Sequence, residues 1–127
     1  MTYDEFNKFC GSLHATTYVM QWNNAHVWKI GPKIFAIGSL GQGNLEKENQ
    51  PAFIFKTSDL NFDFLSDLSG YKPAPYFASR GMKWIQHYDS SAKTDEELTY
   101  YLKESYKIVS LGLTKKLQKQ LGLNQVK

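Results

Sequence analysis

Hydrophobic and polar positions follow two different periods in the amino-terminal part of the chain. In residues 3–13 the apolar side chains recur at helical spacing, and Thr2 with Glu5 forms a capping-box signature, which predicts a helix. In residues 18–30 the period falls to two, and an Asn-Asn pair at residues 23–24 supplies a turn. This segment is therefore predicted to form two strands joined by that turn.

Three further extended runs follow along the chain. Residues 33–39 and 52–57 predict a third and a fourth strand, separated by a polar loop that contains several glycines. Residues 83–88 predict a fifth strand. The stretch before it, residues 71–82, contains Pro73 and Pro75 and is expected to be irregular.

Helical spacing returns in three segments. Ser58 or Asp59 is expected to cap a helix that ends at Gly70, with one apolar side and one acidic side. The apolar side is predicted to contain Leu60, Phe64 and Leu68, and the acidic side Asp59, Asp63 and Asp67. Thr94 with Glu97 predicts a capped helix reaching Val109, and residues 114–121 predict a short basic helix that stops at Gly122.

These elements predict an α+β fold in which an antiparallel sheet of about five strands carries helices on one face. The chain has 127 residues, of which 42% are hydrophobic. This length suits one domain of about 100–150 residues, so a single domain over residues 1–127 is expected.

Composition indicates the cellular compartment and the state of the single cysteine. The amino terminus is acidic and polar, and the sequence has no apolar run of about 18 residues, so a cytoplasmic protein without a membrane partner is expected. The single cysteine, Cys10, cannot form an internal disulfide and is expected to pack as a small hydrophobic residue with a raised pKa. We also expect a monomer.

Metal-binding and catalytic patterns are weak. His14, His26 and His87 lack metal-ligand spacing and are interpreted as surface or turn residues. Glycines 38, 41 and 43 lack the Lys-Ser/Thr pair of a phosphate loop and are interpreted as hairpin glycines. The acidic side of the second helix is typical of a solvated face, although aligned carboxylates can also gather divalent cations weakly. We therefore expect no enzyme activity, no cofactor and no metal.

Basic and aromatic residues form the more informative pattern. Between Tyr71 and Tyr88, cations are interleaved with aromatic residues and no carboxylate intervenes. Such segments suit phosphate neutralisation and base or sugar packing. The proposed phosphate-neutralising cations are Lys29, Lys33, Lys56, Lys72, Arg80 and Lys83. The competing interpretation places the aromatics in the core and the cations on its solvated rim.

Several motifs resemble those of the MmcQ/YjbR family of small bacterial proteins. They are Lys33-Ile34-Phe35-Ala36, Phe53-Ile54-Phe55-Lys56, Pro73-Ala74-Pro75-Tyr76, Lys83-Trp84-Ile85, Ser105-Tyr106 and Leu113-Thr114-Lys115-Lys116-Leu117. The resemblance implies a frataxin-like fold, similar also to a double-wing DNA-binding domain. Ser105 and Tyr106 lie among apolar neighbours, so a buried hydrogen-bonding role is expected for them rather than catalysis.

Three functional hypotheses follow. The first is a non-enzymatic protein that binds double-stranded DNA through the six cations, with lysine-bearing hairpin tips acting as wings and Lys115 and Lys116 lying away from them. The second is a small-ligand or protein-binding module built on an aromatic cleft of Tyr76, Trp84 and Tyr106. Convergence of the cations on one face favours DNA binding, whereas aromatics around a cavity favour the module. A third hypothesis, metal handling of the frataxin type, requires further carboxylates near Asp59, Asp63 and Asp67.

Overall fold

One antiparallel sheet organises the chain. A computed structural model describes residues 1–21, 24–40, 51–88 and 95–125, and it places six strands in the order β1-β2-β3-β4-β6-β5. All neighbouring strands pair antiparallel. The strands are β1 (Thr16–Gln21), β2 (Ala25–Ile30), β3 (Lys33–Leu40), β4 (Pro51–Lys56), β5 (Tyr71–Pro73) and β6 (Trp84–His87). The predicted α+β class and antiparallel sheet are confirmed.

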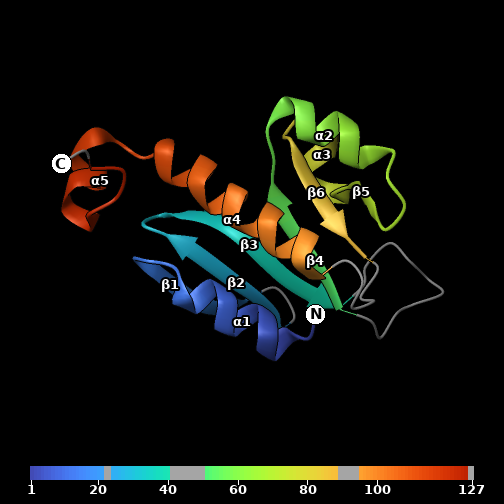
Figure 1. The fold of residues 1–127 in the computed structure, drawn as a ribbon, viewed down its shortest axis with the longest axis horizontal. Helices are drawn as coiled ribbons and strands as arrows, with labels where there is room; N and C mark the ends of the chain where they lie inside the picture. The colour runs from blue at the N-terminus through green and yellow to red at the C-terminus, as the bar shows by residue number, and fades with distance from the viewer. Residues whose placement is uncertain (22–23, 41–50, 89–94, 126–127) are drawn as a thin grey trace.

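Three helices cover one face of this sheet, which we call the main face (Figure 1). They are α1 (Tyr3–Ser12), α2 (Asp59–Ser66) and α4 (Asp95–Leu111). Thr2 closes the predicted capping box at α1, with both of its reciprocal hydrogen bonds to Glu5. Thr94, the predicted cap of α4, and most of the predicted glycine loop lie outside the described residues.

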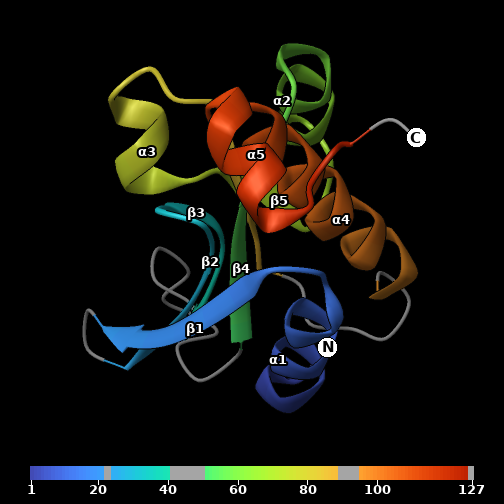
Figure 2. The ribbon, with the colours of Figure 1, turned by 90° about the vertical axis from the view of Figure 1, so that its left-hand side faces the viewer.

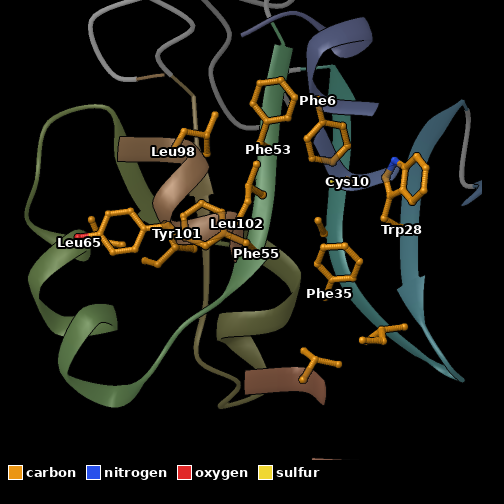
Figure 3. Close-up of a cluster of buried hydrophobic side chains, with 14 of the residues drawn as sticks. Phe6, Cys10, Trp28, Phe35, Phe53, Phe55, Leu65, Leu98, Tyr101 and Leu102 are labelled. Carbon is orange, nitrogen blue, oxygen red and sulfur yellow. The ribbon is translucent and has the colours of Figure 1, made fainter. Parts of the chain in front are cut away.

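The core fills the space between these helices and the main face. Phe6 of α1 packs against Phe53 of β4 with ring centroids 4.8 Å apart, and Tyr101 of α4 stacks on Phe55 at 6.0 Å (Figure 3). Cys10 is fully buried in the same cluster. Burial raises the pKa of its thiol, as expected for a cysteine that packs as a hydrophobic residue.

The segment predicted to be irregular contains two regular elements. Residues 71–73 form the edge strand β5, and helix α3 (Pro75–Ser79) follows it. Proline suits the first turn of a helix because the missing N–H would have no intrahelical partner there. Figure 2 shows α3 on the opposite side of the sheet from α1 and α4. The helices α1, α2 and α4 thus cover one face as predicted, and α3 is an additional helix on the other face.

The predicted apolar side of α2 is also wrong in part. Leu65 is the buried residue of this helix and packs in the core, whereas Leu60 is 79% exposed and Phe64 is 56% exposed. Spacing alone permitted either side of this short helix to face inward. Contacts of α2 with β5 and β6 select the side that contains Leu65.

The last helix, α5 (Lys115–Leu121), matches its prediction at both ends. The Thr114 hydroxyl accepts a hydrogen bond from the backbone N–H of Leu117, and Gly122 ends the helix in the left-handed conformation. In Figure 1, α5 lies beyond the end of α4, next to the turn that joins β2 and β3.

Candidate nucleic-acid interface

Three of the six predicted cations share the face on which α3 lies, which we call the α3 face. Lys56 pairs with Trp84, and Lys72 pairs with Gln86. Because successive residues of a strand point to opposite faces, both lysines lie on the face opposite to the neighbouring core residues of their strands. Lys29 pairs with Ile34, whose side chain packs on the apolar cluster of the α3 face. All three lysines are half-buried.

The spacing of these lysines follows from the strand order. Lys56 on β4 is two strands from Lys29 on β2, and two strands in the other direction from Lys72 on β5. Neighbouring strands lie about 4.8 Å apart, and each residue advances about 3.3 Å along a strand. The backbone positions of consecutive lysines are therefore roughly 10–12 Å apart, in a diagonal row across the face.

Charge is segregated between the layers of the fold. The six described strands contain Lys29, Lys33, Lys56 and Lys72 but no aspartate or glutamate. Within the described part of the chain, every carboxylate side chain lies on α1, α2 or α4, or on the cap residue Asp67. The strands and α3 thus give the α3 face a positive charge without acidic residues of their own.

Helix α3 extends this face at its β6 end. Phe77 stacks on Trp84 with ring centroids 4.8 Å apart, and the Trp84 side chain is only 5% exposed. Trp84 is therefore buried, and its cover comes from α3 and not from the main core. Arg80 follows at the carboxyl end of α3 and is exposed.

Lys33 is directed away from this row. It pairs with Ile30 of the main core, and its ammonium donates a hydrogen bond to the carbonyl of Gly112, at the carboxyl end of α4, over 3.3 Å. A cation at this position interacts favourably with the negative end of the helix dipole. Lys33 therefore has a structural role on the side of the sheet opposite to Lys29.

The turn between β2 and β3 is also covered. Gly31 has a φ of +57°, and a Cβ atom there would lie 3.3 Å from Leu117 Cδ2 and 3.4 Å from Leu121 Cδ1. The predicted hairpin tip therefore packs against α5 and is not a projecting wing. For the same reason Lys115 and Lys116 on α5 do not lie away from this tip, and they are a poor control for it.

The remaining predicted cation turns toward α2. The Lys83 ammonium lies 4.7 Å from the centroid of the Phe62 ring, a cation–π contact on the main-face side. Lys72, by contrast, lies 5.7 Å from the ring of Tyr88. The structure thus groups Lys29, Lys56 and Lys72 with the nearby α3, and it separates Lys33 and Lys83 from them.

The aromatic residues of the alternative cleft do not surround one cavity. Trp84 lies on the α3 face, whereas Tyr106 of α4 packs edge-on against Phe35 on the main face, at 5.5 Å. The Tyr106 hydroxyl donates to the carbonyl of His14, and burial raises the pKa of this tyrosine. The side chain of Tyr76 lies outside the described part of the structure.

Ser105 has the buried hydrogen-bonding role expected from its apolar neighbours. Its hydroxyl donates to the carbonyl of Phe35 over 2.6 Å and accepts the backbone N–H of Lys56 over 2.9 Å. The side chain is fully buried. Ser105 therefore joins β3 to β4 next to the bulge that interrupts the pairing of β2 with β3.

His87 and Gly38 do not lie where the sequence predicted them. His87 is fully buried in β6, and only His14 fits the prediction of an exposed residue near a turn. Gly38 lies within β3 rather than in a hairpin turn, and a Cβ atom there would lie 3.0 Å from the Phe6 ring. Asp59, Asp63 and Asp67 are exposed, and the described residues contain no group of three metal-ligating side chains.

Sequence reasoning missed two features of this surface. The helical cover of Trp84 was signalled by Pro75, which is typical of the first turn of a helix. The second feature is that the absence of carboxylates noted between Tyr71 and Tyr88 extends to the other described strands, which could have been read from the predicted strand segments. The docking of α5 on Gly31 had no local signal because the contacting residues are far apart in sequence.

The fold and surface define a small α+β protein built on one antiparallel sheet, in which the described strands contain no carboxylate. The model of the YjbR family matches residues 11–108, and the chain belongs to this family. No curated protein matches significantly.

Two solved structures share the fold. A Deinococcus radiodurans protein with the domain DUF419 is 20% identical in sequence, has a TM-score of 0.76, and the match covers 96% of this chain and 88% of that one. A Pseudomonas syringae protein is 14% identical, with a TM-score of 0.69 and coverage of 85% and 98%. Among the described residues, no helix has the length and apolar character needed to cross a membrane.

Proposed function

We propose that this protein binds double-stranded DNA in the cytoplasm without catalysing a reaction on it, and that the α3 face contacts the DNA backbone. The observation that carries the proposal is the charge of the described strands, which have lysines but no carboxylates. Lysines on such a face can neutralise phosphates, and each neutralised phosphate releases condensed counterions. Arg80 at the end of α3 extends the same contact.

From this geometry we expect the six cations to contribute unequally to DNA binding. Lys29, Lys56 and Lys72 share one face, whereas Lys33 donates to the end of α4 and Lys83 lies over Phe62. Contacts of these three lysines and Arg80 with four phosphates give a slope of about −3.6 in a plot of the logarithm of affinity against the logarithm of salt concentration. Sequence preference is expected to be weak, because backbone contacts carry no base information.

The test is a titration of a fluorescein-labelled duplex, followed by anisotropy over a range of salt concentrations. The double variant Lys56→Gln/Lys72→Gln is expected to weaken binding on all duplexes and to reduce the magnitude of the slope by about 2. Glutamine retains part of the aliphatic stem, so packing on the half-buried positions is disturbed little. Thermal unfolding checks that the fold is retained.

The matched control is Lys103→Gln/Lys107→Gln. These exposed residues lie on α4, which covers the main face, and their substitution removes the same amount of charge. The control is expected to keep the wild-type slope within the error of the measurement. Equal losses from both double variants would overturn the proposed interface. Undetectable duplex binding at low salt would overturn DNA binding and favour the ligand- or protein-binding module.

A further inference from the structure

The two edges of the sheet differ in their protection against pairing with another strand. The β5 edge is three residues long and contains Lys72 and Pro73. Short length, lysine and proline are all features that prevent edge-to-edge association. This edge is therefore closed to a further strand.

The β1 edge has none of these protective features. It is six residues long, Thr16–Gln21, and it contains no charged residue and no proline. Tyr18 is 42% exposed and Met20 is 49% exposed, although both are large apolar side chains. Alternate residues of an edge strand direct their N–H and C=O groups away from the sheet, so β1 offers backbone groups for pairing.

We propose that two copies of this chain associate by antiparallel pairing of their β1 strands. A two-fold axis pairs a strand with its own copy in the antiparallel direction, so the same surface serves both partners. The uncharged strand creates no like-charge repulsion along the contact. The closed β5 edge prevents head-to-tail growth, which limits the assembly to a dimer.

The side-chain pattern of β1 selects the register. An axis through Val19 places Tyr18 of each copy opposite Met20 of the other, on the main-face side, and Val19 opposite its own copy on the α3 face. The two exposed apolar residues then cover each other. An axis perpendicular to the sheet also places the two α3 faces on one side of a continuous sheet.

This dimer is independent of DNA binding, and its first test needs no ligand. Sedimentation of the full chain over a range of concentrations is expected to show a monomer–dimer equilibrium. Met20→Lys introduces a charge at the edge and is expected to shift this equilibrium to monomer. Leu60→Lys on exposed α2 is the matched control and is expected to leave it unchanged.

Disulfide formation tests the register. In Val19→Cys the two new thiols lie across the axis, on paired residues whose Cα atoms are about 4.5–5.5 Å apart, and air oxidation is expected to link the copies. Thr17→Cys is the control, because its two thiols would be about 13 Å apart along the strands. Cys10 does not compete because it is fully buried.

Three results would overturn the proposal. The first is a wild-type chain that stays monomeric at the highest concentration reached. The second is a dimer that survives Met20→Lys, which would place the contact elsewhere on the surface. The third is cross-linking of Thr17→Cys as rapid as that of Val19→Cys, which would show collision rather than a fixed register. Binding of an extended peptide by a monomeric chain would assign the β1 edge to a different partner.

Discussion

Individual polar side chains link the helices to the strands of the sheet. Ser105 bonds two backbone groups on different strands, and Asn7 of α1 accepts the indole N–H of Trp28 over 2.9 Å. An indole can only donate, so the Asn7 oxygen is fixed toward Trp28 and its amino group faces His26 Nδ1. These polar residues position the elements around the core.

Trp84 gives a prediction at this scale. Trp84 belongs to β6, and its side chain is buried under the Phe77 ring of α3. The variant Trp84→Ala therefore removes a large apolar contact and leaves a cavity. The free energy of unfolding is expected to fall by about 3–5 kcal/mol, measured by urea denaturation.

The companion variants separate burial from side-chain size. Phe77→Ala removes the partner ring and is expected to destabilise the protein, because Trp84 then loses its cover. Phe64→Ala, at an exposed position on α2, is expected to change stability by no more than about 0.5 kcal/mol. An equal effect of Trp84→Ala and Phe64→Ala would contradict the packing described for α3.

At the scale of elements, the terminal helix is part of the fold rather than an appendage. Leucines of α5 pack on the turn between β2 and β3, and the His14 ring bonds the carbonyl of Leu121 at the end of the helix. The helix therefore links the start of the sheet to the end of the chain. This contact also determines where the β2–β3 hairpin tip can go.

The docking of α5 predicts different effects at two glycines. Both Gly31 and Gly81 have positive φ, but a Cβ atom on Gly31 meets leucine side chains and one on Gly81 meets nothing within 4 Å. In Gly81→Val, backbone strain alone is expected to lower the free energy of unfolding by about 1–2 kcal/mol. In Gly31→Val, overpacking is expected to lower the free energy of unfolding by roughly a further 1–3 kcal/mol.

The measurement for both glycine variants is chemical denaturation, with the two chains compared under identical conditions. A larger loss at Gly31 supports a packed hairpin tip. Equal losses would indicate that the tip can move away from α5 at little cost, which would restore it as a candidate wing.

At the scale of the whole molecule, burial of ionisable groups predicts how stability depends on pH. Burial raises the pKa of Tyr3 to about 12, against an opposing contribution from the backbone of Ala52. An unfolded tyrosine loses its proton near pH 10, so the folded state holds this proton more tightly. The stabilisation is complete below about pH 10 and is lost as pH rises toward about 12.

The expected result is a free energy of unfolding that falls between about pH 10 and about pH 12, and falls less steeply in Tyr3→Phe. Tyr100→Phe is the control, since Tyr100 is 55% exposed. Cys10, whose thiol pKa is also raised by burial, contributes to the same alkaline loss in all three proteins. Identical pH dependence in wild type and Tyr3→Phe would show that Tyr3 is not the group responsible.

The sequence by itself determined the elements whose causes are local. Thr2 and Thr114 cap their helices through residues only three positions away, and Gly122 ends α5 with a positive φ. Away from the bulge in β3, alternation within the strands likewise determined which residues share a face. The α+β class followed from these elements, as did the buried roles of Ser105 and Cys10, because a run of apolar neighbours indicates burial whatever the partners are.

Only the tertiary structure decided how these elements face one another. The bulge between Trp28 and Lys29 shifts the register of β2 against β3, so Phe35 and Ala36 both face the main core although they are adjacent in sequence. The inward side of α2 was decided by its contacts with β5 and β6, and the cover of Gly31 by α5. These relations depend on pairs of residues distant in sequence, whose contacts no local period or cap encodes.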